Sequence, residues 1–337
     1  MTHDFSKVTE KLLACRAALI FTHVNMDGDA VGSSAALCLA MRKLGKECYI
    51  LKEDKLGDYL RFLVPEGLFT DLGADGSVTL PDGSVPYSWE LSIAVDMGSD
   101  SRLERRKDAF YSAPASVCVD HHPAQGEFAD CRVVDRDCPA AALLVYELIK
   151  ELNVEIDREM ADLLYAGIIT DTGSFKYENS GPEAHRAAAE LIELGARYEL
   201  LSLKLLDTHA LETLRVEDTA MERAETVCGG RGIVSYITLA DLERCGARPE
   251  NAETAIDRLR VLKTAELAAV LKEREPGVYK LSARSKLTGL ARELALRFGG
   301  GGHAKASGAT LEMPLEQAYG AVKAACEELL ESAEESL

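Results

Sequence analysis

The stretch that decides the fold is Ala17–Asp29, which reads AALIFTHVNMDGD. Residues 17–22 form a short apolar run, as expected for a buried strand, and a helical pattern follows from Asp29 to Leu44. Further apolar runs lie at Glu47–Leu51, Leu91–Val95 and Ser116–Val119. Because strands alternate with helical segments, the sequence predicts an α/β protein with a doubly wound, mainly parallel sheet.

The length of 337 residues is enough for two domains. Helical patterns dominate from Pro139 to Val227, and a second α/β pattern starts at Ile233. We therefore expect an N-terminal α/β domain at residues 1–190, a helical linker at 191–228 and a smaller C-terminal α/β domain at 229–337.

The local structure of two further stretches can be predicted. The polar stretch from Ser202 to Ala224 contains no strand pattern and predicts one connecting helix. The stretch from Asp71 to Ser88 is rich in Gly, Asp and Pro, and it predicts a loop or a small excursion from the sheet.

The chain is acidic, with 38 Lys and Arg against 56 Asp and Glu and a net charge of −18. This balance argues against binding to long duplex DNA or to an anionic membrane surface. The nine cysteines form no C-x-x-C pair, the N-terminus has no signal-peptide pattern, and no apolar run reaches the length of a membrane span. We expect a cytoplasmic protein with reduced thiols.

Histidine and aspartate residues gather where three predicted strands and one helical run end. They are His23, Asp27, Asp29, Asp96, Asp120, His121, His122 and Asp171. Taken singly, Asp-Gly-Asp and Asp171-Thr172 could be turns or helix caps. Because the carboxyl ends of parallel strands meet in one crevice, we expect the side chains to lie close together.

Carboxylates gathered in one crevice repel one another, and bound cations remove that repulsion. Carboxylate and imidazole ligands without thiolates favour Mn²⁺ or Mg²⁺, with Zn²⁺ or Fe²⁺ as alternatives. The chain has no G-x-S-x-G nucleophile motif and no cysteine–histidine signature that would indicate covalent catalysis. These residues therefore predict a divalent metal site.

The order of the motifs resembles that of the DHH phosphoesterase superfamily. H-x3-D-G-D, a strand-end Asp, D-H-H and T-D-T-G occur in the family's order, and Gly299–His303 (GGGGH) matches the signature of the associated substrate-binding domain. The resemblance covers nearly the whole chain and is greatest to the NrnA-type enzymes, which act on short oligoribonucleotides and 3′-phosphoadenosine-5′-phosphate. Met26 stands where the family usually has Pro, a change that removes no ligand.

The resemblance implies a site for two Mn²⁺ ions, with Mg²⁺ as the alternative. One ion would be held by His23, Asp27 and Asp96, and the other by Asp29, Asp96, His121 and Asp171. Asp120 would orient an imidazole, His122 would face the substrate phosphate, and Arg102 would orient that phosphate.

A second site is implied in the C-terminal domain. The nucleotide would be bound by Arg284, Ser285, Gly300, Gly301, Gly302 and His303. Consecutive glycines let backbone amides approach a phosphate or a base closely, although a flexible loop before a strand would have the same composition. The stretch Gly277–Thr310 has six basic residues and one acidic residue, a local charge of +5 that would suit a short nucleotide.

The predicted activity is hydrolysis of short oligoribonucleotides, linear dinucleotides or 3′-phosphoadenosine-5′-phosphate by a water molecule that two metal ions activate. The alternatives are a manganese-dependent inorganic pyrophosphatase of the same superfamily, a RecJ-like exonuclease on longer strands, and a nucleotide sensor without turnover. The resemblance also suggests a homodimer.

Overall fold

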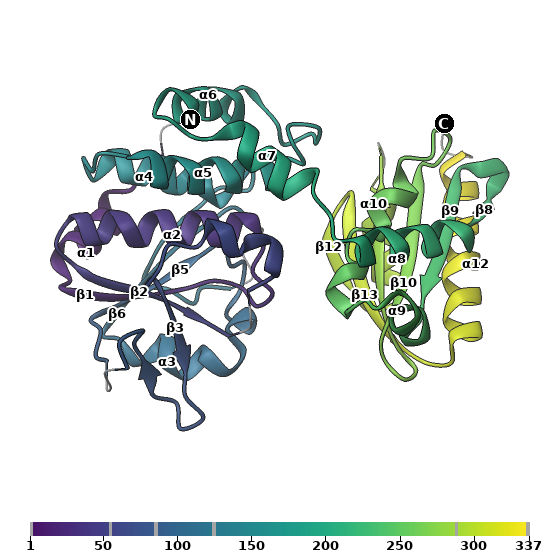
Figure 1. Ribbon diagram of the computed structural model, residues 1–337, viewed down its shortest axis with the longest axis horizontal. Coiled ribbons are helices and arrows are strands. Elements are labelled where there is room, and N and C mark those ends of the chain that lie inside the picture. The colour runs from purple at the N-terminus through teal and green to yellow at the C-terminus, as the bar shows by residue number, and fades with distance from the viewer. Residues whose placement is uncertain (1–2, 54–55, 84–86, 123–125, 287–288, 335–337) are drawn as a thin grey trace. The chain divides into compact units, whose positions relative to one another are not determined.

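The computed structural model describes residues 3–53, 56–83, 87–122, 126–286 and 289–334. The chain forms two compact units, Met1–Thr208 and His209–Leu337 (Figure 1). Each unit has its own sheet and its own hydrophobic core.

The first unit contains a seven-stranded sheet in the order β4-β3-β2-β1-β5-β6-β7. Its strands are β1 (Ala17–Phe21), β2 (Glu47–Lys52), β3 (Phe69–Leu72), β4 (Val78–Thr79), β5 (Leu91–Val95), β6 (Ala115–Asp120) and β7 (Cys131–Val134). All neighbouring pairs are parallel except β3 and β4. The chain winds outward from β1 in both directions, which confirms the predicted doubly wound sheet.

The sheet is wider than predicted. The β3–β4 hairpin lies partly within the stretch 71–88 that was expected to form a loop or a small excursion from the sheet, and β7 was not predicted. These strands are two to four residues long and lie at the sheet edges, where a short segment carries too little apolar pattern to be recognised.

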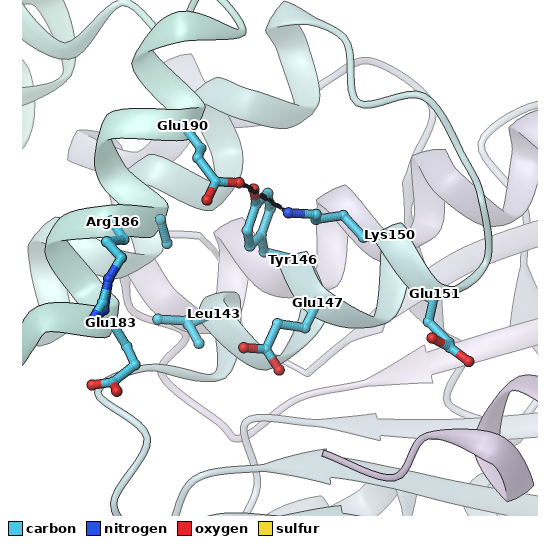
Figure 2. A pocket seen from close by; sticks show the side chains of 9 residues that line it. Leu143, Tyr146, Glu147, Lys150, Glu151, Glu183, Arg186 and Glu190 are labelled. Carbon is cyan, nitrogen blue, oxygen red and sulfur yellow. Dashed lines mark hydrogen bonds and ion pairs between the residues drawn. The ribbon is translucent and has the colours of Figure 1, made fainter. Parts of the chain in front are cut away.

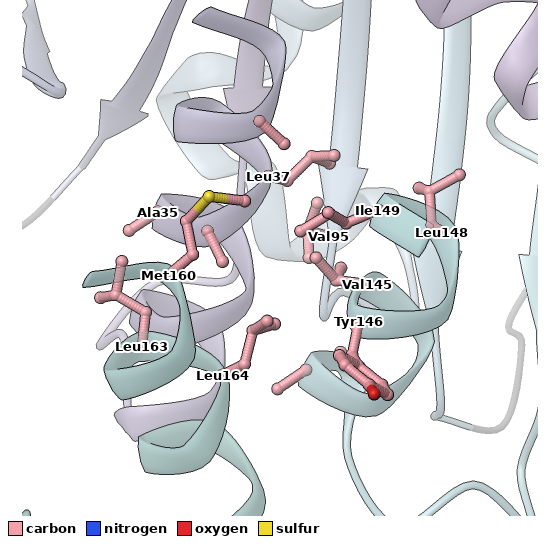
Figure 3. Packing of buried hydrophobic residues seen from close by; sticks show 14 of the residues in the cluster. Ala35, Leu37, Val95, Val145, Tyr146, Leu148, Ile149, Met160, Leu163 and Leu164 are labelled. Atoms are coloured by element: carbon pink, nitrogen blue, oxygen red, sulfur yellow. The ribbon is translucent and has the colours of Figure 1, made fainter. Parts of the chain in front are cut away.

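Helices cover both faces of this sheet. α1 (Ser6–Ala14), α2 (Gly28–Lys43) and α4 (Ala141–Glu151) share one core with the sheet, and α5 (Arg158–Asp171) packs behind them against α2 (Figures 1 and 3). α3 (Lys107–Ser112) lies on the other face. The close contact between α2 and α5 requires a glycine, because a Cβ atom at Gly32 would lie 2.3 Å from the Leu163 carbonyl oxygen.

The second unit contains a six-stranded sheet in the order β12-β13-β11-β10-β9-β8. Its strands are β8 (Glu225–Val227), β9 (Gly232–Ile237), β10 (Leu267–Glu275), β11 (Val278–Ser285), β12 (Gly301–His303) and β13 (Ala306–Glu312). Only β9 and β10 pair in parallel. This sheet confirms the smaller α/β domain, and Gly301–His303 of the glycine-rich stretch form the strand β12 instead of a flexible loop.

Two sets of helices pack on this second sheet. α11 (Leu290–Arg297) and α12 (Leu315–Glu334) cover one face. α8 (Leu211–Glu222), α9 (Leu239–Cys245) and α10 (Ala255–Arg260) share a separate core with β9 and β10 on the other face.

The expected single helix from Ser202 to Ala224 is wrong. α6 (Pro182–Glu193) is followed by α7 (Tyr198–Leu206), and α8 begins only at Leu211. α8 buries Val216 and Ala220 in the core of the second unit, so it is part of that unit. The break contains neither Gly nor Pro, which is why the sequence did not indicate it.

All nine cysteines are free thiols. Among the residues that the structure describes, no helix is both long enough and apolar enough to cross a membrane.

Candidate metal centre

The first predicted cluster lies where β1 leads into α2. Asp27 caps α2, because its Oδ1 accepts hydrogen bonds from the amides of Asp29 at 3.1 Å and Ala30 at 3.0 Å. His23 Nδ1 lies 2.7 Å from the Val24 carbonyl oxygen, so Nδ1 carries the proton. His23 Nε2 is therefore the atom that faces Asp27, at 3.7 Å from its Oδ2.

Asp96, which follows β5, lies at the middle of the cluster and is 1% exposed. Its backbone has a positive φ of 57° and its amide donates to the Val119 carbonyl at 3.1 Å. Asp96 Oδ2 lies 3.5 Å from His23 Nε2, whereas Oδ1 lies 3.5 Å from His121 Nε2 and 3.4 Å from His122 Nδ1. One carboxylate is thus shared by three imidazoles.

Asp29 is fully buried and is held by the start of α4. Its Oδ2 accepts a hydrogen bond from the Ala141 amide at 2.6 Å, and its Oδ1 accepts one from the Ala142 amide at 2.8 Å. α4 receives no side-chain cap from its own N-cap residue, Ala140. The Asp29 carboxylate therefore caps α4 from another part of the chain, and the helix terminus stabilises its negative charge.

Asp171, the last residue of α5, brings a fourth carboxylate to the cluster. Its Oδ2 lies 3.2 Å from His121 Nε2, and the same nitrogen lies 3.8 Å from Asp29 Oδ2. α5 approaches this closely because Gly167 has no side chain. A Cβ atom at Gly167 would lie 2.7 Å from Asp29 Oδ1.

Asn179 links the Asp171 segment to the start of α4, and it was not predicted from the sequence. Its side-chain amide donates to the carbonyl of Pro139, just before α4, at 3.0 Å and to the carbonyl of Asp171 at 3.1 Å. Its Oδ1 is buried and accepts no hydrogen bond from the described residues. No local motif marks Asn179, since it lies in a polar loop after α5.

Asp120 ends β6, is 1% exposed, and orients His122. Asp120 Oδ1 lies 2.9 Å from His122 Nδ1. The neighbouring His121 is oriented differently, with its Nδ1 at 3.2 Å from the Cys138 carbonyl oxygen. The two rings pack edge to face with 4.6 Å between their centroids.

Arg102 lies on the short helix η2 (Asp100–Arg106) and is exposed. Within the described residues, its side chain makes no hydrogen bond or ion pair with the cluster. The backbone of Arg102 is held by Arg106, a fully buried arginine that donates to the Arg102 carbonyl at 3.2 Å and to the Leu51 carbonyl at 3.0 Å. Arg106 was not predicted as part of the site.

The cluster has more negative charge than its surroundings neutralise. Burial, together with the carboxylates of Asp96 and Asp171, raises the pKa of Asp29 well above its ordinary value. Burial also raises the pKa of Asp171 to about 7, although His121 opposes this. Conversely, Asp27 and Asp96 raise the pKa of His23 to about 11 against the effect of burial.

These residues fit divalent cations. Three groups of side chains each offer ligand atoms within 4.8 Å of one another: His23, Asp27 and Asp96; Asp29, His121 and Asp171; and Asp96, His121 and His122. Asp96 Oδ1 is buried and accepts no hydrogen bond from the described residues, as expected of an atom that binds an ion. Oxygen and imidazole donors without thiolates suit Mn²⁺ or Mg²⁺. The structure thus brings together all six residues predicted as ligands.

The residues predicted to bind the nucleotide lie in the second unit. Arg284 on β11 and His303 on β12 both pair with Ala306 of β13, so the two residues occupy one row across three strands. Gly300 must be a glycine, because a Cβ atom there would lie 2.1 Å from the Gly308 carbonyl oxygen. Gly301 and Gly302 form the start of β12.

Ser285 is positioned differently from Arg284. It is buried, and alternation along β11 places its side chain on the opposite face of the sheet. Its hydroxyl oxygen accepts a hydrogen bond from the Ala291 amide at 3.4 Å, near the start of α11. In this structure the Ser285 hydroxyl therefore contacts α11.

A surface cavity of about 380 Å³ lies between α4 and α6, apart from these residues (Figure 2). Tyr146 and Lys150 of α4 both contact the Glu190 carboxylate of α6, with 2.9 Å between Lys150 Nζ and Glu190 Oε2. None of the residues predicted for the metal or nucleotide site is among those that line it.

The fold and the site define a two-domain α/β protein with a candidate divalent metal centre. Residues 17–168 match the N-terminal domain of the DHH family, and residues 225–334 match the DHHA1 domain. The chain is 33% identical over 335 residues to the bifunctional oligoribonuclease and PAP phosphatase NrnA of Thermus thermophilus, a match that covers 98% of this chain and 93% of that protein. The chain belongs to the DHH family.

Solved structures share the fold. An exopolyphosphatase-related protein from Bacteroides fragilis superimposes with a TM-score of 0.84 at 21% identity, covering 97% of this chain and 95% of that chain. RecJ from Thermus thermophilus in complex with Mn²⁺ gives a TM-score of 0.54 at 17% identity, covering 96% of this chain and 53% of RecJ.

Proposed function

We propose that this chain is a metal-dependent phosphoesterase that hydrolyses short oligoribonucleotides, linear dinucleotides included, and 3′-phosphoadenosine-5′-phosphate. The observation that carries the proposal is the cluster around Asp96, in which one buried carboxylate is shared by three imidazoles and lies among three further carboxylates. The activities named for the Thermus thermophilus relative support the choice of substrates.

Two Mn²⁺ ions would bind at the cluster, with Mg²⁺ as the alternative. His23, Asp27 and Asp96 would hold one ion, and Asp29, Asp96, His121 and Asp171 would hold the other. When bound, such ions lower the pKa of a water molecule and stabilise the negative charge that develops on a phosphate.

The protein's own groups keep the ligands in place. The α4 amides at Ala141 and Ala142 hold both oxygens of Asp29. Asp120 fixes the ring of His122, which would contact the substrate phosphate. Hydrogen bonds of this kind orient ligands and raise metal affinity, so we assign the same role to Asn179, which holds the Asp171 backbone.

Arginines would position the phosphates. Arg102 would contact the phosphate that is cleaved, and Arg106 would hold the backbone of Arg102. In the second unit, Arg284 would form charge-assisted hydrogen bonds with a second phosphate or the sugar edge, and His303 would add a donor. Ser285 and the glycines at 300–302 would shape this surface. Residues 1–190 would then carry the cleavage site and residues 229–337 the substrate site, with 191–228 between them.

The test is a comparison of kcat/KM on pyrophosphate, 3′-phosphoadenosine-5′-phosphate, linear diadenylate and RNAs of increasing length. We expect turnover in Mn²⁺ of the two small nucleotides and of the shortest RNAs, and no turnover after a chelator is added. Hydrolysis of pyrophosphate alone would identify a pyrophosphatase instead, and tight nucleotide binding without turnover would identify a sensor.

Two properties stay predictions. A homodimer is suggested by the family resemblance, and sedimentation equilibrium would measure it. Cytoplasmic location is expected from the acidic composition and the reduced thiols, and cell fractionation would test it.

A further inference from the structure

A second charged cluster lies in the C-terminal unit, where β10 and β11 pair. Lys272 is 1% exposed, and its ammonium group contacts the carboxylate of Glu253. Arg274 contacts the same carboxylate, and Lys280 Nζ lies 3.6 Å from Glu253 Oε1. One carboxylate therefore faces three cations.

Other acids nearby already have partners. Asp257 of α10 pairs with Arg260 at 3.0 Å, and Glu250 pairs with Arg248 at 3.2 Å. Asp257 and Glu250 still favour the charged forms of Lys272 and Arg274, but the pKa of each of these two residues stays lowered. This basic cluster, defined as Lys272, Arg274 and Lys280, keeps an excess of positive charge.

The strand register places the basic cluster on the same face as Arg284. Lys280 pairs with Lys272 of β10, and Lys280 and Arg284 are four residues apart on β11, so their side chains point to one face. At about 3.4 Å per residue, their Cα atoms are about 14 Å apart. Ser282 lies between them on β11, and its neighbour on β13 is Gly308.

The lowered pKa of Lys272 also indicates an excess of positive charge in the basic cluster. Burial, together with Lys280 and Arg284, lowers the pKa of Lys272 to about 7, even though Glu253 contacts its ammonium group. An anion near Lys280 would favour the charged form of Lys272 and reduce the repulsion within the cluster.

We propose that the basic cluster is a second phosphate-binding subsite, which holds an additional backbone phosphate of an oligoribonucleotide whose first phosphate lies at Arg284. Lys280, with half of its side chain exposed, contacts the phosphate. Lys272 is buried and adds positive charge without contacting the phosphate. With their Cα atoms about 14 Å apart, Lys280 and Arg284 can each contact a different phosphate of one strand. The subsite therefore favours RNAs longer than a dinucleotide. This inference rests on the proposed function.

The experiment measures binding of 5′-phosphorylated RNAs of two and five nucleotides in a chelator, where no hydrolysis occurs. Lys280→Gln should weaken binding of the pentanucleotide about two- to fivefold and leave the dinucleotide unchanged. It should also reduce the slope of log affinity against log salt concentration by about 0.7, the value for one phosphate contact on a single strand.

Lys323→Gln is the matched control. Lys323 lies on α12, pairs with a single glutamate, Glu225, and belongs to a helix that packs on the opposite face of the sheet. The control should bind both RNAs as the unmodified chain does. The subsite would be overturned if Lys280→Gln weakened binding of both RNAs equally or of neither. It would also be overturned if Lys323→Gln weakened binding of the pentanucleotide as much as Lys280→Gln does. A chain that binds RNA in this pattern but cleaves none in Mn²⁺ would contradict only the proposed hydrolysis.

Discussion

The metal centre and the basic cluster are charged sites of opposite sign, and they are built in different ways. At the metal centre, strand ends and helix termini bring carboxylates together, and burial raises the pKa of Asp171 to about 7. In the basic cluster, pairing of adjacent strands brings cations together, and burial lowers the pKa of Lys272 to about 7. In both sites the surroundings favour the neutral form of the buried group until an ion of opposite charge binds. The first site therefore suits cations and the second suits phosphates.

The largest expected effect is loss of catalysis on removal of a predicted ligand at the candidate metal centre. His121→Ala should lower kcat on 3′-phosphoadenosine-5′-phosphate by at least about 10³-fold in Mn²⁺, because a metal site supplies several kcal/mol of transition-state stabilisation. Circular dichroism would check that the variant is folded. His209→Ala, which changes an exposed histidine outside the cluster, should keep full activity, and unimpaired turnover by His121→Ala would contradict the site.

The second prediction concerns stability, and it tests the buried charge of the basic cluster. Because the pKa of Lys272 is lower in the folded chain than its ordinary 10.5, the unfolded chain binds more protons between pH 7 and 10.5. The free energy of unfolding should therefore rise with pH in this window, by about 3 kcal/mol between pH 7 and 9.5.

Lys272→Met removes the titrating group, so urea unfolding of this variant should lack that rise for the transition of the C-terminal unit. Lys323→Met, at a position where about a third of the side chain is exposed, should retain it. Equal pH dependence in the unmodified chain and Lys272→Met would show that Lys272 stays charged throughout, through its contact with Glu253.

The third prediction tests the support of the metal centre. Asn179→Asp replaces an amide donor by an acceptor and so removes the hydrogen bonds to Pro139 and Asp171. Mn²⁺ affinity measured by calorimetry should fall about 10- to 100-fold, as for other residues that orient metal ligands. Asn153→Asp is the control, since Asn153 is exposed and its side-chain amide donates to the nearby Glu151 carbonyl at 3.3 Å. Unchanged affinity in Asn179→Asp would exclude the positioning role.

The smallest predicted effect concerns the substrate residues of the second unit. Arg284→Ala should raise KM for a dinucleotide about tenfold with little change in kcat, because a hydrogen bond between charged groups is worth about 1.5 kcal/mol or more. His303→Ala should act in the same direction. An equal fall in kcat with KM unchanged would place these residues in the chemical step instead.

Much of the fold and of the metal centre could be predicted because both depend on local patterns. A strand such as Leu91–Val95 is an apolar run, and the residue that follows it, Asp96, must lie at the carboxyl edge of a parallel sheet. The edge strands β3, β4 and β7 were missed because two to four residues carry too little pattern. The division of residues 202–224 into α7 and α8 was missed because the break has no Gly or Pro.

The sequence by itself determined the doubly wound sheet, the cluster of acidic and histidine residues at its edge, and the DHH family. Only the tertiary structure decided which groups support those side chains and where the basic cluster forms. Asp29 lies 112 residues from the Ala141 amide that binds it, and Lys272 meets Glu253 across a 19-residue separation. Such contacts depend on helix docking and strand register, which bring together residues that no sequence spacing relates.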